Sequence, residues 1–414
     1  MTLLSPVPAP RPAAGAEGPA ARVSLLQRPT ASYYLLLVTT GLLLVIGVVM
    51  VFSASSVQAY AVSGRSWSTG LKQALFVAVG VPAMLIASRL PVRVYRLAAY
   101  PLLLLSLALL VLVLVVGRSA GGAQSWIALG GGFNLQPAEL GKLALVLWGA
   151  DLLTRKQRLL GDWRHLFVPL VPVTCLLLGL VMLQPDLGTS LATVSILVGL
   201  LWVVGAPLRW FAGFFVGMVA VAVALAVAEP YRMERLLAFR DPFADAQDTG
   251  FQAVQSFYAL SSGGWFGLGL GASREKWAGG LPEAHTDFVF AIIGEELGLL
   301  GTLTVLALFA VLVYSGVRIA QRACEPFVRL AAAAVTTLLA CQALMNMGAV
   351  VGLLPITGIT LPLVSFGGSS LLVTLASIGM LLSFARAEPG AREALQARRA
   401  SFAGHRRAVV TAAR

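Results

Sequence analysis

Long apolar runs recur along the sequence and constrain its fold more than any other feature. A helix needs roughly 20 residues to cross the ~30 Å hydrocarbon core of a bilayer. The chain is 58% hydrophobic and only 12% charged, whereas charged residues make up about a quarter of an ordinary soluble domain. We therefore expect an all-α, polytopic membrane protein with about ten transmembrane helices. The predicted spans are about 33–53, 72–89, 96–117, 138–154, 165–183, 187–204, 208–228, 287–316, 327–352 and 363–385.

The positions of these runs divide the chain into three parts. Residues 32–386 form the membrane domain, and residues 229–286, between the seventh and eighth predicted spans, form one large outer loop. Residues 1–31 are poor in large apolar side chains, which predicts a disordered cytoplasmic tail. Residues 387–414 are predicted to form a second cytoplasmic tail. Because no apolar stretch precedes a small-residue cleavage site in residues 1–31, we expect no removable signal peptide.

The basic residues indicate topology rather than a nucleic-acid partner. The net charge is +12, but most of the 30 Lys and Arg residues lie in the tails and in alternate loops. This is the positive-inside bias of membrane proteins, and it predicts that both termini are cytoplasmic. The three cysteines, Cys175, Cys324 and Cys341, lack the repeated spacing of a metal site and are predicted to be free thiols.

Ionisable side chains surround the start of the eighth predicted span. Glu283, His285 and Asp287 precede its first apolar residues, and Glu295 and Glu296 lie within it. Carboxylates at membrane depth are costly and indicate functional sites. Thr286 or Asp287 could instead merely cap the helix, which would lower the pKa of Asp287 and weaken it as a base. The residues alone leave both alternatives open.

Two other predicted spans begin with Gln-Pro and carry an acid in the first turn. In the fourth, Glu139 and Lys142 are three residues apart and share a helix face, so they form either a local ion pair or the lining of a polar cavity. In the sixth, Asp186 is predicted to be the N-cap of its helix. Trp126, in the outer loop of residues 118–132, is predicted to be an interfacial anchor.

The large outer loop contains many buryable aromatic residues, which argues against disorder. Arg232 and Arg235 lie three apart in a segment that predicts a short amphipathic helix facing headgroups or phosphate. Residues 252–262 predict a half-helix that leads into a glycine-rich turn at 263–271. Farther along, residues 361–370 predict either a broken helix whose amides could bind an anion near Ser369 and Ser370, or a plain serine-capped helix start.

Several motifs together resemble a known family. They are SASS at 53–56, QPAELGK at 136–142, QPDLGTS at 184–190, LPEAHTDFVFAIIGEELG at 281–298 and LPLVSFGGSS at 361–370. In this order they are similar to the SEDS family of FtsW, RodA and SpoVE proteins, and the GVVMVFSASS segment is most similar to the division members. Two positions depart from the family pattern, because Ser125 precedes Trp126 where arginine or asparagine is usual, and Gly279-Gly280 stands where tyrosine usually precedes Leu281-Pro282.

The resemblance implies a peptidoglycan polymerase that uses lipid II as donor and acceptor. It further implies a class B penicillin-binding protein transpeptidase and other divisome membrane proteins as partners, at the division septum of a bacterial cell membrane. The essential loop aspartate of the family falls on Asp287. Such a reaction needs a base for the attacking sugar hydroxyl and cations for the departing pyrophosphate.

The resulting hypothesis makes Asp287 the general base of an inverting transfer. Candidate substrate-binding residues are Lys142, Arg232, Arg235, Lys276, Glu283, His285, Ser369 and Ser370, with Glu139, Trp126, Asp186 and Glu295 in supporting roles. Glu295 lies about 80° from Asp287 around an ideal helix, and Glu296 lies about 180° away. No obligatory cofactor is predicted, because the sequence contains no compact loop of oxygen ligands for a metal. Glu283 and Glu295 could still help to hold Mg or Mn.

Two other classes of function remain as alternatives. A lipid II flippase would need polar residues along a path through the membrane, and a non-enzymatic septal scaffold would need no catalytic acid. Most polar residues of the spans cluster at their outer ends and in the outer loop, which favours chemistry at the outer face.

Overall fold

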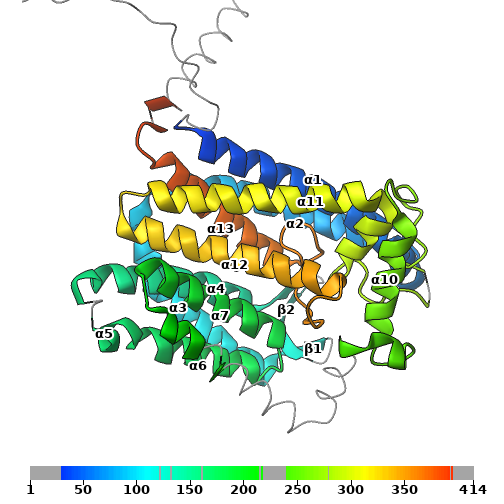
Figure 1. Cartoon of the computed structure of the whole chain (residues 1–414), viewed down its shortest axis with the longest axis horizontal. Coiled ribbons are helices and arrows are strands. Elements are labelled where there is room, and N and C mark those ends of the chain that lie inside the picture. Colours follow the sequence, from blue (N-terminus) through cyan, green and yellow to red (C-terminus); the bar gives the residue numbers. More distant parts are fainter. Residues whose placement is uncertain are drawn as a thin grey trace, which may run out of the picture.

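The chain folds into a bundle of long helices that run roughly side by side (Figure 1). The computed structural model describes residues 29–120, 123–130, 133–159, 162–213, 216–217, 239–277, 279–391 and 393–394. The first helices are α1 (Ala31–Ser63), α2 (Ser68–Ala87), α3 (Val92–Val116), α4 (Pro137–Arg155), α5 (Trp163–Phe167), α6 (Leu170–Met182) and α7 (Leu187–Val204), with the short turn η2 (Gln157–Leu159) after α4. After residue 238 come η3 (Pro242–Asp245), α10 (Phe251–Gly263), α11 (Val289–Arg322), α12 (Pro326–Val350) and α13 (Ser369–Arg386).

Eight helical segments in the described part of the chain are long and apolar enough to cross a membrane. They match eight of the predicted spans, and the predicted helical, polytopic class is confirmed. The fourth predicted span forms α4, which is not among the eight because it carries Glu139, Lys142 and Asp151. The predicted span at 208–228 lies mostly outside the described residues.

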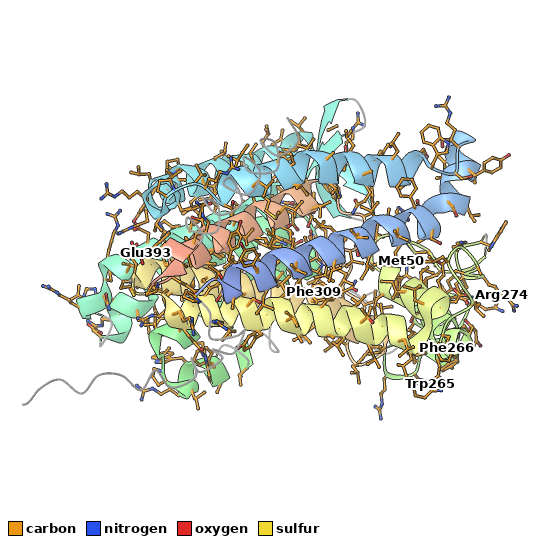
Figure 2. All side chains as sticks on the ribbon, turned by 90° about the horizontal axis from the view of Figure 1, so that it is seen from above. Met50, Trp265, Phe266, Arg274, Phe309 and Glu393 are labelled. Atoms are coloured by element: carbon orange, nitrogen blue, oxygen red, sulfur yellow. The ribbon has the colours of Figure 1, made fainter. Side chains whose placement is uncertain are left out.

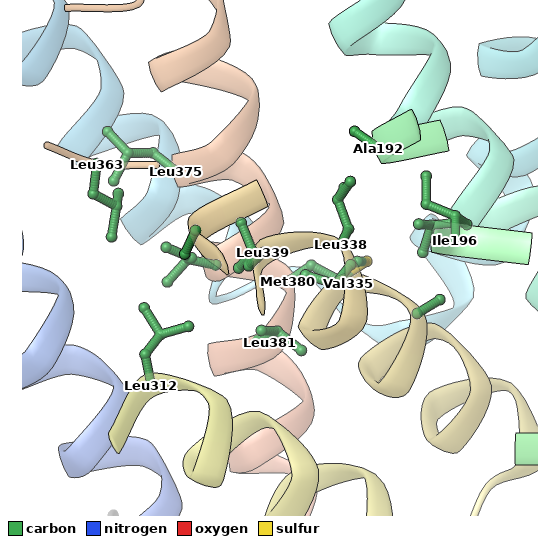
Figure 3. Packing of buried hydrophobic residues seen from close by; sticks show 14 of the residues in the cluster. Ala192, Ile196, Leu312, Val335, Leu338, Leu339, Leu363, Leu375, Met380 and Leu381 are labelled. Carbon is green, nitrogen blue, oxygen red and sulfur yellow. The ribbon is translucent and has the colours of Figure 1, made fainter. Parts of the chain in front are cut away.

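The centre of the bundle is formed by α4, α12 and α13. Helix α4 packs against α3, α7 and α12, and α12 also packs against α11. Figure 3 shows Val335, Leu338 and Leu339 of α12 beside Met380 and Leu381 of α13. Short side chains at the helix contacts, which are typical of membrane proteins, let the backbones approach closely. In α12 these are Ala331, Ala332 and Ala334, all fully buried.

Helix α1 is longer than its sequence predicts. The predicted span covers about 33–53, but the helix continues through the SASS motif at 53–56 to Ser63. The hydroxyl groups remain compatible with a helix because they bond within it: Ser55 Oγ donates to the carbonyl of Val51 at 2.6 Å, and Ser56 Oγ to that of Ser53 at 2.8 Å. The helix ends at Gly64, whose φ of 70° is a common helix terminator.

A small antiparallel sheet follows α3 and adds to the predicted all-helical fold. Its strands are β1 (Arg118–Ala120), β2 (Ala123–Gly130) and β3 (Phe133–Leu135), in the order β1-β2-β3. Trp126 lies in β2, where its Cα is paired with that of Arg118. The sequence predicts only a loop here, because two of the three strands have three residues each and leave almost no periodic signal.

Helix α11 breaks at Gly298, where φ is 68° and ψ is −165°. The glycine-rich turn after α10 fills this break with backbone hydrogen bonds. Leu268 N donates to the carbonyl of Glu295 at 2.9 Å, and Leu299 N donates to the carbonyl of Gly264 at 2.9 Å. The turn therefore replaces the helical hydrogen bonds that the break removes, which is how irregular backbone is tolerated in a membrane protein.

Candidate functional site

Asp287 lies two residues before the first residue of α11, at the junction of three segments. The side-chain amide of Asn346, on α12, donates to the backbone carbonyl of Asp287 and to that of Ile359, each at 2.7 Å. The Asp287 Oδ2 atom lies 3.7 Å from the position that a Cβ at Gly358 would occupy. The start of α11, helix α12 and the chain after α12 thus meet at Asp287.

The Asp287 side chain does not cap α11. The N-cap residue is Phe288, with no side-chain cap bond, and Thr286 Oγ1 instead donates to Glu283 Oε2 at 2.9 Å. Burial, and then the negative charges of Glu283 and Asp186, raise the pKa of Asp287 to about 7. Of the two alternatives that the sequence left open, the structure disagrees with the cap, which would have lowered this pKa.

Asp186 caps α7 as predicted. Its Oδ1 atom accepts from Thr189 N at 2.9 Å, and its Oδ2 atom accepts from the Thr189 hydroxyl at 2.8 Å. Gln136 Nε2 also donates to Asp186 Oδ2, at 3.1 Å, while Gln136 N donates to the Ser369 hydroxyl at 3.1 Å. The beginnings of α4, α7 and α13 therefore meet in one polar cluster next to Asp287.

Glu139 and Lys142 form the local ion pair that was one of their two predicted alternatives. Lys142 Nζ lies 2.7 Å from Glu139 Oε1, and the two side chains are only 3% and 9% exposed. A buried pair of this kind neutralises both charges within α4. A role for Lys142 in substrate binding stays a prediction.

Lys276 and Glu296 form a second buried pair, close to the break in α11. Lys276 Nζ lies 3.2 Å from Glu296 Oε1, and it donates to the carbonyl of Gly271 at 2.6 Å. The hydroxyl of Ser53, on α1, donates to both Glu296 oxygens, at 2.6 and 2.7 Å. The structure thus engages Lys276, a predicted pyrophosphate ligand, in holding the outer loop to α1 and α11.

Glu295 also binds the outer loop. Its Oε1 atom accepts from Arg274 N at 2.7 Å, and its Oε2 atom accepts from the Ser273 hydroxyl. This network contains Glu295 and not Glu283, which is exposed and bonded to Thr286. Glu283 and Glu295, the two acids named as possible helpers in holding a divalent cation, therefore lie in different networks. In the described part of the chain, no three His, Cys, Asp or Glu side chains gather as metal ligands.

The remaining predicted residues are placed as follows. His285 is largely buried, its pKa is lowered by that burial, and its ring lies 5.6 Å from that of Phe366. Ser369 is buried and Ser370 is half-buried at the start of α13. Arg232 and Arg235 lie outside the described residues. The structure thus brings Asp287, Glu283, Asp186 and Ser369 to one end of the bundle.

Sequence reasoning missed Asn346, Gln136 and Gly358 as members of the site. Asn346 is a lone amide in an otherwise apolar helix, and such intramembrane polar residues usually have a structural or functional partner. Gln136 opens the QPAELGK motif, in which the proline and the acid give the clearer signals. Gly358, with a φ of 71°, gives no signal of its own, because its neighbour Asp287 is remote in sequence.

The fold and the site together define a multi-pass helical membrane protein with an acidic site at the ends of its central helices. A family model described as "Cell cycle protein", for the FtsW, RodA and SpoVE proteins, matches residues 33–389. The chain belongs to this family, as its motifs predicted.

Curated relatives cover most of the chain. The probable peptidoglycan glycosyltransferase FtsW of Mycobacterium tuberculosis is 43% identical over 376 residues, which cover 90% of this chain and 71% of that protein. Stage V sporulation protein E of Bacillus subtilis is 39% identical over 363 residues, which cover 87% of this chain and 98% of that protein.

Solved structures share the fold. Thermus thermophilus rod shape determining protein RodA matches with a TM-score of 0.63 and 29% identity, covering 86% of this chain and 96% of that chain. A chain from a structure described as "Structural coordination of polymerization and crosslinking by a peptidoglycan synthase complex" matches with a TM-score of 0.71 and 32% identity, covering 86% of this chain and 98% of its own length.

Proposed function

We propose that Asp287 is the general base in the peptidoglycan glycosyltransferase reaction of this chain. The single observation that carries the proposal is a carboxyl group whose pKa is raised to about 7, at one end of a membrane-spanning bundle. A general base works best when its pKa lies near the working pH. Burial and the two neighbouring acids raise the pKa of Asp287. Asn346 donates a hydrogen bond to the backbone carbonyl of Asp287 and so fixes the position of this residue.

The proposed substrate is lipid II, as donor and as acceptor. The sugar 4-hydroxyl of the acceptor attacks the anomeric carbon of the donor, and the new glycosidic bond forms as the bond to undecaprenyl pyrophosphate breaks. The hydroxyl proton passes to the Asp287 carboxylate and then to water. A single base without a carboxylate nucleophile gives inversion at the anomeric carbon. Charge on the departing pyrophosphate requires cations or amide donors, and the predicted ligands Arg232, Arg235 and Ser370 remain candidates for this role.

The test is polymerisation of lipid II by the purified full-length protein. Asp287→Asn removes the base with almost no change in size, and we expect its rate to fall by about 10²- to 10⁴-fold. Asp248→Asn, at an exposed position of the same outer loop, is the matched control and should retain the normal rate. Polymerisation by Asp287→Asn at the control rate would exclude Asp287 as the base.

The proposed partner is a class B penicillin-binding protein transpeptidase, and the proposed location is the division septum. Support comes from relatives named FtsW, which are 41–44% identical to this chain, and from the structural match to a chain of a peptidoglycan synthase complex. Copurification with the cognate transpeptidase, followed by measurement of glycan length with and without it, tests the partnership. Two proteins that do not copurify, and glycan lengths that do not differ, would contradict it.

A further inference from the structure

The glycine-rich turn after α10 exposes a dense group of large apolar side chains. Trp265, Phe266, Leu268 and Leu270 are 67%, 80%, 41% and 60% exposed. Figure 2 places Trp265 and Phe266 near one end of the bundle, far from Glu393 at the other end. A contiguous apolar patch of this kind marks an interaction surface. We call residues 264–270 the aromatic turn.

The backbone of the aromatic turn is fixed by hydrogen bonds to α11. Gly269 N donates to the carbonyl of Glu296 at 3.0 Å, and Leu300 N donates to the carbonyl of Trp265 at 3.3 Å. A Cβ at Gly267 would overlap the carbonyl of Glu296, which shows how closely the turn and α11 approach. The outward direction of the apolar side chains is therefore part of the fold.

Large apolar side chains are also exposed on the part of α11 that adjoins the aromatic turn. Beyond Gly298, Leu299, Leu300, Leu303 and Leu306 are 41%, 49%, 48% and 45% exposed. Leucines exposed on a membrane-spanning helix face lipid tails. The aromatic turn lies directly next to them, because its Gly264 and Trp265 carbonyls accept hydrogen bonds from Leu299 N and Leu300 N. Farther along the bundle axis, Figure 2 shows the charged side chain of Arg274.

We propose that the aromatic turn inserts Trp265, Phe266 and Leu268 into the outer leaflet of the bilayer and anchors the outer loop at headgroup depth. Tryptophan concentrates at membrane interfaces because its ring is amphipathic, and the apolar side chains beside it add burial. The order along the bundle matches this placement: leucines at lipid depth, aromatic rings next, and a charge outermost. The loop that is anchored in this way leads through Lys276 directly to Asp287.

The experiment measures depth with a fluorescent label on the full-length protein in phospholipid nanodiscs. A background without Cys175, Cys324 and Cys341 receives single cysteines by Phe266→Cys, Arg274→Cys or Leu303→Cys. Each is labelled with an environment-sensitive fluorophore and quenched by lipids with a nitroxide near the headgroup, by lipids with a nitroxide deep in the acyl chain, or by aqueous iodide. Position 303 is the control for lipid depth, and position 274 is the control for water.

We expect the label at 266 to emit at shorter wavelength than the label at 274 and to be quenched most by the shallow nitroxide. We expect the label at 303 to be quenched most by the deep nitroxide and the label at 274 most by iodide. A label at 266 that is quenched by iodide as strongly as the label at 274 would overturn the proposal. Protection of position 266 only after addition of the transpeptidase would also overturn it, because the surface would then dock a protein. Lipid II polymerisation is measured separately, so failure of the anchor leaves the role of Asp287 unaffected.

Discussion

At the scale of single residues, the protonation state of Asp287 makes the polymerisation rate depend on pH. Only the ionised carboxylate can accept a proton, so we expect polymerisation to decline as pH falls through about 7, the pKa of Asp287. Asp186→Asn removes one of the charges that raise this pKa, while asparagine retains the ability to cap α7. The decline should therefore move to lower pH in this variant. The pH–rate profiles of the two proteins provide the measurement, and identical profiles would show that Asp186 does not act on Asp287.

The same pKa predicts a pH-dependent stability. The value of about 7 in the folded protein lies above the ordinary 3.8 of an aspartate, so the folded state favours the protonated form. Ionisation therefore costs stability progressively as pH rises from about 4 to 7, and the full cost is present above 7. Asp287→Asn removes this cost and should stabilise the protein by up to about 4 kcal/mol at pH 8 and hardly at all at pH 4. Thermal melting in detergent at both pH values tests this, with Asp248→Asn as the control.

Asn346 is expected to be a positioning residue for Asp287. It is 3% exposed and joins two backbone carbonyls from separate segments, so Asn346→Leu should leave both carbonyls without this donor and cost about 1 to 3 kcal/mol of stability. Because the Asp287 backbone would be released, kcat should fall by about 10-fold or more while KM changes little.

The matched control for Asn346 is Gln73→Leu. Gln73 is also a buried amide, and it donates to the carbonyl of Ser365 at 3.2 Å without contacting Asp287. We expect a comparable loss of stability but a smaller loss of kcat. Equal losses of kcat in the two variants would assign Asn346 a purely structural role.

At the scale of elements, the sequence predicted most spans but not the break in α11. Spans follow from apolar length alone, and Asp186 and Asp287 follow from motifs that are local in sequence. The break depends on contacts that no local pattern contains: Ser53 and Glu296, which hold the two sides of this region together, are 243 residues apart. Asn346 and Asp287 are 59 residues apart, so their contact was equally hidden.

Gly298 tests how the break and the aromatic turn depend on each other. Its φ of 68° is unfavourable for any residue with a Cβ, and a Cβ there would lie 2.6 Å from the Trp265 carbonyl oxygen. Gly298→Ala should therefore destabilise the protein by about 1 to 3 kcal/mol and increase hydrogen exchange in residues 264–270. Gly179→Ala, in an open position of α6, should stabilise its helix by up to about 1 kcal/mol. Unchanged hydrogen exchange of residues 264–270 in Gly298→Ala would show that the aromatic turn does not depend on the break in α11.

At the scale of the whole molecule, the two ends of the bundle have different tasks. The end that carries Asp287 holds the ion pairs of Lys142 and Lys276, but it also places Glu283 and Asp186 near Asp287. The repulsion between these three acids costs stability and raises the pKa of the base. The other end collects complementary charges: Asp151, at the far end of α4, lies 3.0 Å from Arg96 Nε and 2.6 Å from Arg155 Nε. Arg96 also reaches Glu325 at 3.3 Å, so α3, α4 and the start of α12 are joined there.

This division predicts that stability and catalysis can be changed separately. Asp151 is fully buried and accepts from both arginines, so Asp151→Asn weakens these charged hydrogen bonds and should cost about 1 to 3 kcal/mol. Glu325→Gln should cost at most about 1 kcal/mol, since the Glu325 side chain is 43% exposed. Asp151 lies about 20 Å along α4 from Gln136, so both variants should keep normal kcat and KM for lipid II below their melting temperatures. The melting temperature and the KM for lipid II are measured for the same Asp151→Asn preparation. A changed KM would show that the two ends of the bundle are coupled through α4.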